Sequence, residues 1–243
     1  MNLVIDIGNS RVKMGVFENK QLLELHLTIN EELSAAISMF LGKYEISHIA
    51  LAQVGRQSDD WKAAVPSKVH VLEIDQGTPT PVTTQYKTPE SLGIDRICAV
   101  VGALGRFPSH PVLVIDAGTC VTYDLIEPGG IHLGGGISPG YKMRLDAMHH
   151  FTARLPLVAP TTSPSKLGID TVSSLTFGSF YGMAHEINGL IAHFTGTYPN
   201  LVVILTGGDA SIFEQHIENT IFAAPNLVLE GINSILLYNT VPE

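Results

Sequence analysis

A short apolar run that ends on an acid and a glycine occurs twice in this chain and constrains its fold more than any other feature. The copies are residues 3–8 (LVIDIG) and 113–118 (LVIDAG), which lie 110 positions apart and are identical at five of six positions. Each apolar run predicts a buried strand, and each glycine predicts a turn where a side chain would crowd a ligand or strain the backbone. The repeat therefore predicts two halves that fold alike.

The residues after each copy extend the repeat. Residues 11–17 and 121–126 alternate between apolar and polar side chains, and each run reaches a turn, at 18–21 and at 127–130. This pattern predicts an antiparallel hairpin in each half. A chain of 243 residues is long enough for two such domains, which we expect at 1–110 and 111–243.

Strands and helices are expected to alternate along the rest of the chain, which predicts an α/β fold rather than a bundle or a sandwich. Further strands are expected at 22–29, 47–54, 68–74, 201–205 and 227–229. Helices are expected at 31–42, 61–65, 95–105, 141–151, 171–194 and 231–238. The glycine-rich residues 134–140 (GGGISPG) predict a turn.

Composition restricts the choice of partners. A net charge of −9 and a pI near 5.5 argue against nucleic acid or an anionic membrane as the main partner. The two cysteines form no CxxC pair, so they indicate neither a disulfide scaffold nor a zinc site. No run approaches the ~18 apolar residues of a spanning helix. We therefore expect a cytoplasmic protein that binds neither nucleic acid nor a membrane.

The two acidic turns are the strongest candidates for a functional site. Backbone N–H groups and small hydroxyls such as those of Ser10 and Thr119 can surround phosphate oxygens, while a carboxylate holds a cation. An ordinary tight turn in which Asp accepts local N–H groups has the same sequence, but the duplication favours a phosphate site. The chain has no P-loop, GxGxxG, GxSxG or HExxH motif.

Weaker candidates each have an ordinary structural explanation. Lys13 shares a strand face with Arg11 and either contacts phosphate or is a solvated lysine. Asp95 and Arg96 combine a possible general base with a forked cation, although alone they indicate a helix start and a surface arginine. The strand that ends at Thr206-Gly207-Gly208 is a common place for a ligand to approach a backbone. The histidines are interpreted as structural or solvated groups, and Asp146 and Glu186 as helix-face charges.

Six motifs occur together in chain order: DIGNS at 6–10, GIDR at 93–96, DAGT at 116–119, GGGISPG at 134–140, TARLP at 152–156 and TGG at 206–208. In this combination the chain resembles the type III pantothenate kinases, of the acetate and sugar kinase, heat-shock and actin superfamily. The resemblance extends from residue 3 to about residue 238. It implies duplicated ribonuclease-H-like (actin-like ATPase) domains, with the active site in the interdomain cleft, and a homodimer.

The resemblance also implies roles for individual residues. ATP would be bound by Asp6, Ile7, Gly8, Asn9, Ser10, Arg11, Val12, Lys13, Thr119, Thr206, Gly207 and Gly208. Asp6 and Asp116 would organise Mg²⁺ and a monovalent cation, K⁺ or NH₄⁺. Pantothenate would be bound by Tyr86, Gly93, Ile94, Asp95, Arg96 and, from the neighbouring subunit, Thr171.

In the implied reaction Asp95 accepts the proton of the pantothenate hydroxyl, and the product is 4′-phosphopantothenate, the entry to coenzyme A. Two alternatives stay open. One is a non-catalytic regulator that keeps the fold and binds nucleotide, although a binding module has no need of a base such as Asp95. The other is a different enzyme of the superfamily, which the GIDR motif disfavours.

Overall fold

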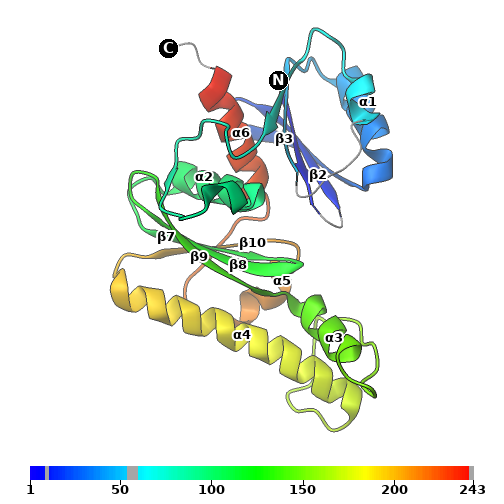
Figure 1. Cartoon of the computed structure of the whole chain (residues 1–243), viewed down its shortest axis with the longest axis vertical. Coiled ribbons are helices and arrows are strands. Elements are labelled where there is room, and N and C mark those ends of the chain that lie inside the picture. Colours follow the sequence, from blue (N-terminus) through cyan, green and yellow to red (C-terminus); the bar gives the residue numbers. More distant parts are fainter. Residues whose placement is uncertain (9–10, 54–59, 241–243) are drawn as a thin grey trace. The chain divides into compact units, whose positions relative to one another are not determined.

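Two β-sheets carry the fold, and the computed structural model describes residues 1–8, 11–53 and 60–240 (Figure 1). The chain divides into two compact units. Unit 1 comprises Met1–Pro108, Ile126–Leu133 and Asn226–Glu243, and unit 2 comprises Ser109–Leu125 and Gly134–Pro225. The expected end of one strand at Val54 lies outside the described residues.

Unit 1 is built on a five-stranded sheet of order β3-β2-β1-β4-β5. Its strands are β1 (Asn2–Ile7), β2 (Val12–Glu18), β3 (Gln21–Thr28), β4 (His48–Gln53) and β5 (His70–Ile74). β1 pairs antiparallel with β2 and parallel with β4, as expected for a hairpin followed by a crossover. The buried strand and the hairpin predicted from the first copy of the repeat are therefore confirmed.

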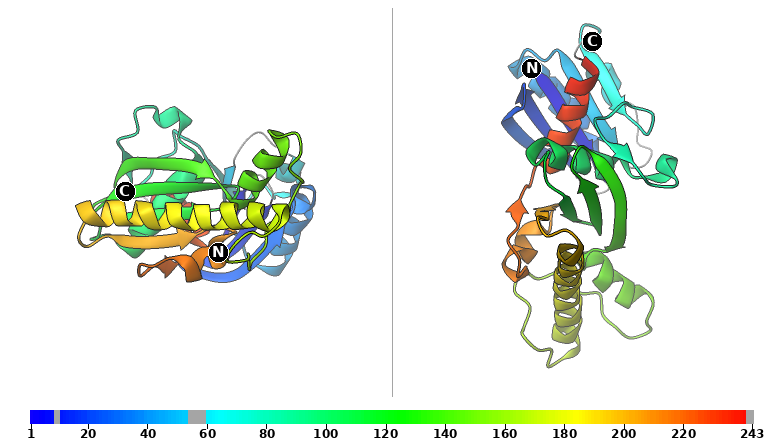
Figure 2. Two further views of the ribbon diagram at one scale, coloured as in Figure 1. Left: turned by 90° about the horizontal axis from the view of Figure 1, so that it is seen from below. Right: turned by 90° about the vertical axis from the view of Figure 1, so that its left-hand side faces the viewer.

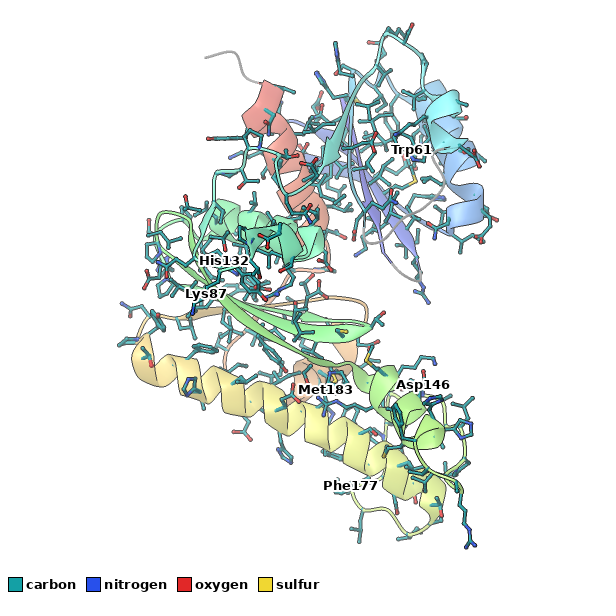
Figure 3. All side chains as sticks on the ribbon, in the orientation of Figure 1. Trp61, Lys87, His132, Asp146, Phe177 and Met183 are labelled. Atoms are coloured by element: carbon teal, nitrogen blue, oxygen red, sulfur yellow. The ribbon has the colours of Figure 1, made fainter. Side chains whose placement is uncertain are left out.

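Alternation along β1 directs its side chains to two different layers. Leu3, Ile5 and Ile7 join a core cluster with α1 (Leu33–Lys43) and with Trp61, which lies in the short helix η2 (Asp60–Ala64) (Figure 3). The opposite face carries Asn2, whose side-chain amide donates to Asn233 Oδ1 of α6 (Leu227–Thr240) at 3.1 Å. Asp6, at an even position like Asn2, therefore points away from the α1 layer.

Helices α2 (Ile94–Arg106) and α6 pack closely against each other in unit 1. Glycines permit this contact: a Cβ on Gly231 would lie 1.7 Å from Cys98 O, and one on Gly102 would lie 2.4 Å from Leu227 O. Residues 227–240 form one helix, so the separate strand expected at 227–229 is wrong. Its apolar side chains recur at the spacing of a helix face, for example at Leu229, Ile232 and Leu236, which are all buried.

The second sheet is six-stranded, with order β11-β10-β7-β8-β9-β6. Its strands are β6 (Thr83–Thr84), β7 (Val112–Ala117), β8 (Cys120–Glu127), β9 (Ile131–Pro139), β10 (Val202–Thr206) and β11 (Phe222–Ala223). Without the short β6, the second sheet read in reverse has the order β9-β8-β7-β10-β11. Numbered along the chain within each sheet, this is the same strand order, third-second-first-fourth-fifth, as in the first sheet. The α/β class and the like-folded halves predicted from the repeat are confirmed at the level of strand order.

The turn predicted at 134–140 is wrong, because residues 131–139 form strand β9. Gly135 serves close approach rather than chain reversal, because a Cβ on it would lie 1.6 Å from Tyr123 O of the neighbouring strand β8. Glycine content alone does not distinguish these two uses.

Unit 2 is covered by the long helix α4 (Thr171–Thr197), which runs along one face of the second sheet (Figure 2). Its buried side chains recur at helical spacing, for example Phe180, Met183 and Ile187, which are all fully buried. Met183 lies between this helix and the strands (Figure 3). The shorter helices are α3 (Tyr141–His150) and α5 (Ala210–Phe213).

The contact-based units differ from consecutive segments of the chain. Unit 1 takes in α6, from the far end of the sequence, because that helix packs against α2 and β1. The division at 110/111 describes the internal repeat and stays a prediction. Within the described part of the chain, no helix is long and apolar enough to cross a membrane.

Candidate active site

The acidic turn of unit 1 begins at Asp6, next to the last residue of β1. Asp6 is partly buried, and burial followed by the charge of Asp95 raises its pKa from 3.8 to about 6, while Lys13 acts in the opposite direction. Lys13 lies opposite Asp6 in the β1–β2 register. Beyond the strand, the Gly8 N–H donates to Arg11 O at 3.1 Å and closes the turn. Two carboxylates and an ammonium group thus act on one another at this strand end.

Asp95 lies in the first turn of α2, where a carboxylate is stabilised by the helix dipole. Its Oδ1 accepts the Arg96 N–H at 2.9 Å. A Cβ on Gly93 would lie 2.4 Å from the same oxygen, so glycine leaves the space that this carboxylate occupies. The predicted proximity of Asp95 to a helix N-terminus is confirmed.

Arg96 is not an ordinary surface arginine. It is only 5% exposed, and its guanidinium lies 5.5 Å from the centre of the Tyr86 ring. The Tyr86 N–H donates to Thr84 Oγ1 at 3.1 Å, and Thr84 Oγ1 also lies 2.9 Å from Nδ1 of the buried His132. The structure thus brings together Tyr86 and Arg96, two side chains that lie ten positions apart in the sequence.

The acidic turn of unit 2 spans residues 116–119 and lies between two glycines. On one side, a Cβ on Gly207 would lie 2.2 Å from Ala117 O and 2.5 Å from Asp116 Oδ1. On the other side, a Cβ on Gly140 would lie 2.1 Å from Gly118 O. Gly207 has φ +98°, a conformation that glycine adopts readily. Only backbone without side chains can approach the turn this closely.

Strand pairing brings the TGG motif to the same turn. Thr206 lies opposite Asp116 in the parallel β10–β7 register, and the Asp209 N–H donates to Ala117 O at 2.9 Å. Thr119 and Gly208 are exposed at this end of the sheet. The DAGT and TGG motifs, whose first residues are 90 positions apart in sequence, are therefore adjacent.

Other predicted residues lie elsewhere or outside the described part of the chain. Thr171 is exposed in the first turn of α4, a helix capped by Asp170. Arg11 is exposed, and Val12 and Ile94 are buried. Asn9 and Ser10 lie outside the described residues.

Sequence reasoning missed two features of unit 2. Gly140 abuts the acidic turn, although its motif predicted only a chain reversal. Glu186, interpreted as a helix-face charge, accepts hydrogen bonds from Tyr123, Ser138 and Arg144. By contrast, Asp146 pairs with Lys142 one helical turn away, as a helix-face charge would. No local spacing distinguishes Glu186 from Asp146, because the partners of Glu186 are distant in sequence.

Each acidic turn, taken by itself, suits a phosphate group with a metal ion. Mg²⁺ is usually held by one or two carboxylates together with substrate phosphates, so a single carboxylate such as Asp6 or Asp116 can serve as a protein donor. Burial and then the charge of Asp95 raise the pKa of Asp6, and a bound cation would favour its charged form.

Solved structures with the same fold define the class. A protein from Campylobacter jejuni described under the Baf family of transcriptional activators superposes with a TM-score of 0.63 at 22% identity, over 98% of both chains. A ROK family glucokinase from Streptomyces griseus, in complex with glucose and AMPPNP, superposes with a TM-score of 0.50 at 13% identity, over 96% of this chain and 98% of its own. The chain thus has the duplicated ribonuclease-H-like fold of the actin-like ATPases and sugar kinases.

Sequence similarity is more specific. The family model for type III pantothenate kinase matches residues 2–193. A type III pantothenate kinase from Phocaeicola vulgatus is 42% identical over 240 residues, covering 98% of this chain and 99% of its own. One from Bacteroides fragilis is also 42% identical, covering 98% of each chain. The chain belongs to the type III pantothenate kinase family, as the resemblance of its motifs implied.

Proposed function

We propose that this chain transfers the γ-phosphoryl group of ATP to the hydroxyl of pantothenate, giving 4′-phosphopantothenate for coenzyme A synthesis. The observation that carries the proposal is the grouping of Asp95 with Asp6 at one strand end, directly beside the buried Arg96. The family supplies the substrate, and this grouping supplies an acceptor for its proton. A non-catalytic nucleotide-binding regulator would have no use for Asp95 in this position.

The pantothenate side of the reaction falls to unit 1. Arg96 is a planar cation suited to fork onto the carboxylate of pantothenate, and the Tyr86 ring holds its guanidinium in place. Asp95 orients the primary hydroxyl and accepts its proton. Phosphoryl transfer passes through a loose transition state, so positioning and charge neutralisation supply most of the rate.

The nucleotide side uses both acidic turns and the TGG motif. Residues 6–13 and Thr119 contact the phosphates, and Thr206, Gly207 and Gly208 contact the adenosine. Asp6 and Asp116 would supply the protein donors for Mg²⁺, which when bound would neutralise charge on the phosphates. Asp116 would also hold a monovalent cation, K⁺ or NH₄⁺.

The active protein is proposed to be a cytoplasmic homodimer, with its active site between the ribonuclease-H-like domains 1–110 and 111–243. Thr171 would reach the pantothenate bound by the neighbouring subunit. Strongly exposed apolar side chains around Thr171 support an interface there: Leu167 is 67%, Ile169 87% and Val172 50% exposed.

The decisive experiment measures ATP consumption with and without pantothenate, in potassium and again in sodium. We expect turnover that requires pantothenate and potassium or ammonium, and that falls about 100-fold or more in Asp95→Asn. Glu90 is an exposed carboxylate close to Asp95 in the sequence, so Glu90→Gln is the matched control and should keep wild-type turnover. Nucleotide binding without pantothenate-dependent turnover in any cation would favour the regulator instead.

A further inference from the structure

Four polar side chains form a network in unit 2: Tyr123, Ser138, Arg144 and Glu186, here called the Glu186 network. Glu186 on α4 accepts hydrogen bonds from the Tyr123 hydroxyl at 2.8 Å, from the Ser138 hydroxyl at 3.1 Å and from the Arg144 guanidinium. Arg144 on α3 also donates to Ser138 Oγ at 3.0 Å and to Pro139 O at 2.8 Å. The network joins β8, the end of β9, α3 and α4.

The charges of this network are well matched. Burial would raise the pKa of Glu186, but hydrogen bonds from Arg144, Tyr123 and Ser138 lower it below its usual value. Burial and then the bond to Glu186 raise the pKa of Tyr123 far above its usual value. The side chains of Arg144 and Glu186 are only 21% and 27% exposed, so the pair is more shielded than a surface ion pair.

The segment held by the network lies directly against the acidic turn of unit 2. Arg144 fixes Ser138 and Pro139, and the next residue, Gly140, donates its N–H to Thr119 O at 3.1 Å. The absence of a side chain on Gly140 brings its backbone against Gly118 O as well. Any shift of residues 138–140 is therefore transmitted to Gly118 and Thr119.

Helix α4 does not need the ion pair in order to pack on the sheet. Phe180, Met183, Ile187 and Ile191 are all fully buried and supply an apolar face along the helix. Arg144 donates hydrogen bonds to Ser138, Pro139 and Glu186, and the first two of these acceptors lie in residues 138–140, the segment that contacts the turn. This distribution is expected of a group that fixes that segment.

We propose that Glu186 and Arg144 are positioning residues that hold the turn at 116–119 in the geometry that binds the nucleotide phosphates. The proposal rests on the proposed function, because it takes this turn to be a phosphate site. Arg144 acts through the backbone of residues 138–140 and touches no substrate. Lysine could not replace it, since one ammonium group cannot serve Ser138, Pro139 and Glu186 with a planar fork.

The test measures MgATP binding by calorimetry, without pantothenate, together with the KM values for ATP and for pantothenate. For Glu186→Gln and Arg144→Lys we expect MgATP affinity to fall about tenfold and the KM for ATP to rise in parallel. The KM for pantothenate should change less than about twofold, because the turn at 116–119 does not form the proposed pantothenate site. Tyr123→Phe keeps the ring and removes one hydroxyl, so it should give a smaller change in the same direction.

Asp146→Asn is the matched control, because it breaks the Lys142–Asp146 ion pair of the same helix at a more exposed position. It should leave MgATP affinity unchanged. Wild-type affinity in folded Glu186→Gln and Arg144→Lys would overturn the proposal, as would equal losses for both substrates. Should either variant fail to fold, Tyr123→Phe decides by the same criteria.

Amide hydrogen exchange on the ligand-free protein separates this proposal from the proposed function. Glu186→Gln should speed exchange at Gly118 and Gly140, whose N–H groups bond to Cys120 O and Thr119 O, and leave residues 2–7 of β1 unchanged. Unchanged exchange at Gly118 and Gly140 would overturn the positioning role. If the wild type does not bind MgATP but Glu186→Gln still speeds amide exchange at Gly118 and Gly140, the proposed function fails. The inference that Glu186 holds the turn in place would then still be supported.

Discussion

Asp6 is held in its charged form at a cost to the fold. Burial and the neighbouring Asp95 both oppose its ionisation, and Lys13 compensates only in part, so its pKa stays raised at about 6. Ligand sites commonly carry such unfavourable groupings, because the bound substrate and its cation supply the missing charge.

The substitution Asp6→Asn should therefore stabilise the metal-free protein at neutral pH while abolishing turnover. Between pH 4 and pH 6 the folded state binds more protons at Asp6 than the unfolded state, whose pKa is 3.8, so stability falls as pH rises through this window. The loss of unfolding free energy caused by the ionised Asp6 carboxylate is complete above about pH 7 and amounts to about 1–3 kcal/mol.

Denaturant unfolding in EDTA at pH 7.5 and at pH 4.5 measures this effect. Asp6→Asn should exceed the wild type in unfolding free energy at pH 7.5 and lose most of that advantage at pH 4.5. Glu90→Gln, at an exposed position, should follow the wild type at both values. A variant that is equally or less stable at pH 7.5 would show that the burial of Asp6 carries no such cost.

Among the elements, the junction of β10 with the acidic turn of unit 2 depends on one glycine. Gly207→Ala would place a methyl group 2.2 Å from Ala117 O at a φ of +98°. The contacted atom belongs to the backbone of the turn, so relieving the overlap would require a backbone shift at a cost in free energy. We expect a loss of about 2–4 kcal/mol in unfolding free energy, because steric overlap and backbone strain add.

Gly208→Ala is the matched control for this prediction, since a Cβ there meets nothing within 4 Å. Its melting temperature should stay close to that of the wild type, whereas that of Gly207→Ala should drop by several degrees, roughly as expected for this domain size. Equal melting temperatures for the two variants would contradict the steric argument.

At the scale of the whole molecule, the proposed dimer is tested through the apolar residues beside Thr171. Ile169 is 87% exposed, which is costly for an isoleucine unless a partner covers it. Ile169→Asp should convert the dimer to a monomer in light scattering and raise the KM for pantothenate, because Thr171 would no longer reach the partner's substrate.

Leu27→Asp provides the comparison, since Leu27 is a 52% exposed leucine on strand β3 of unit 1. It should leave the mass unchanged. A wild-type chain that is monomeric at assay concentration and fully active would remove both the dimer and the role of Thr171.

The sequence by itself determined the parts of this protein that depend on local chemistry. The repeated LVID run predicted β1 and β7 because continuous apolar residues bury on both faces of a sheet. The first-turn position of Asp95 followed from the residues around it, and the ordered motifs identified the family. An acidic turn and a helix start each depend on residues that are close together in the sequence, so short sequence patterns can predict them.

Only the tertiary structure decided which distant residues meet, because packing between elements leaves no fixed spacing in the chain. It placed residues 134–139 in strand β9, and it set Gly135 and Gly140 against the backbone of neighbouring segments instead of in a chain reversal. It buried Arg96 against Tyr86 and gave Glu186 partners on three other elements. The acidic turns were evident from the residues, but the groups that hold them in place became visible only when the chain was folded.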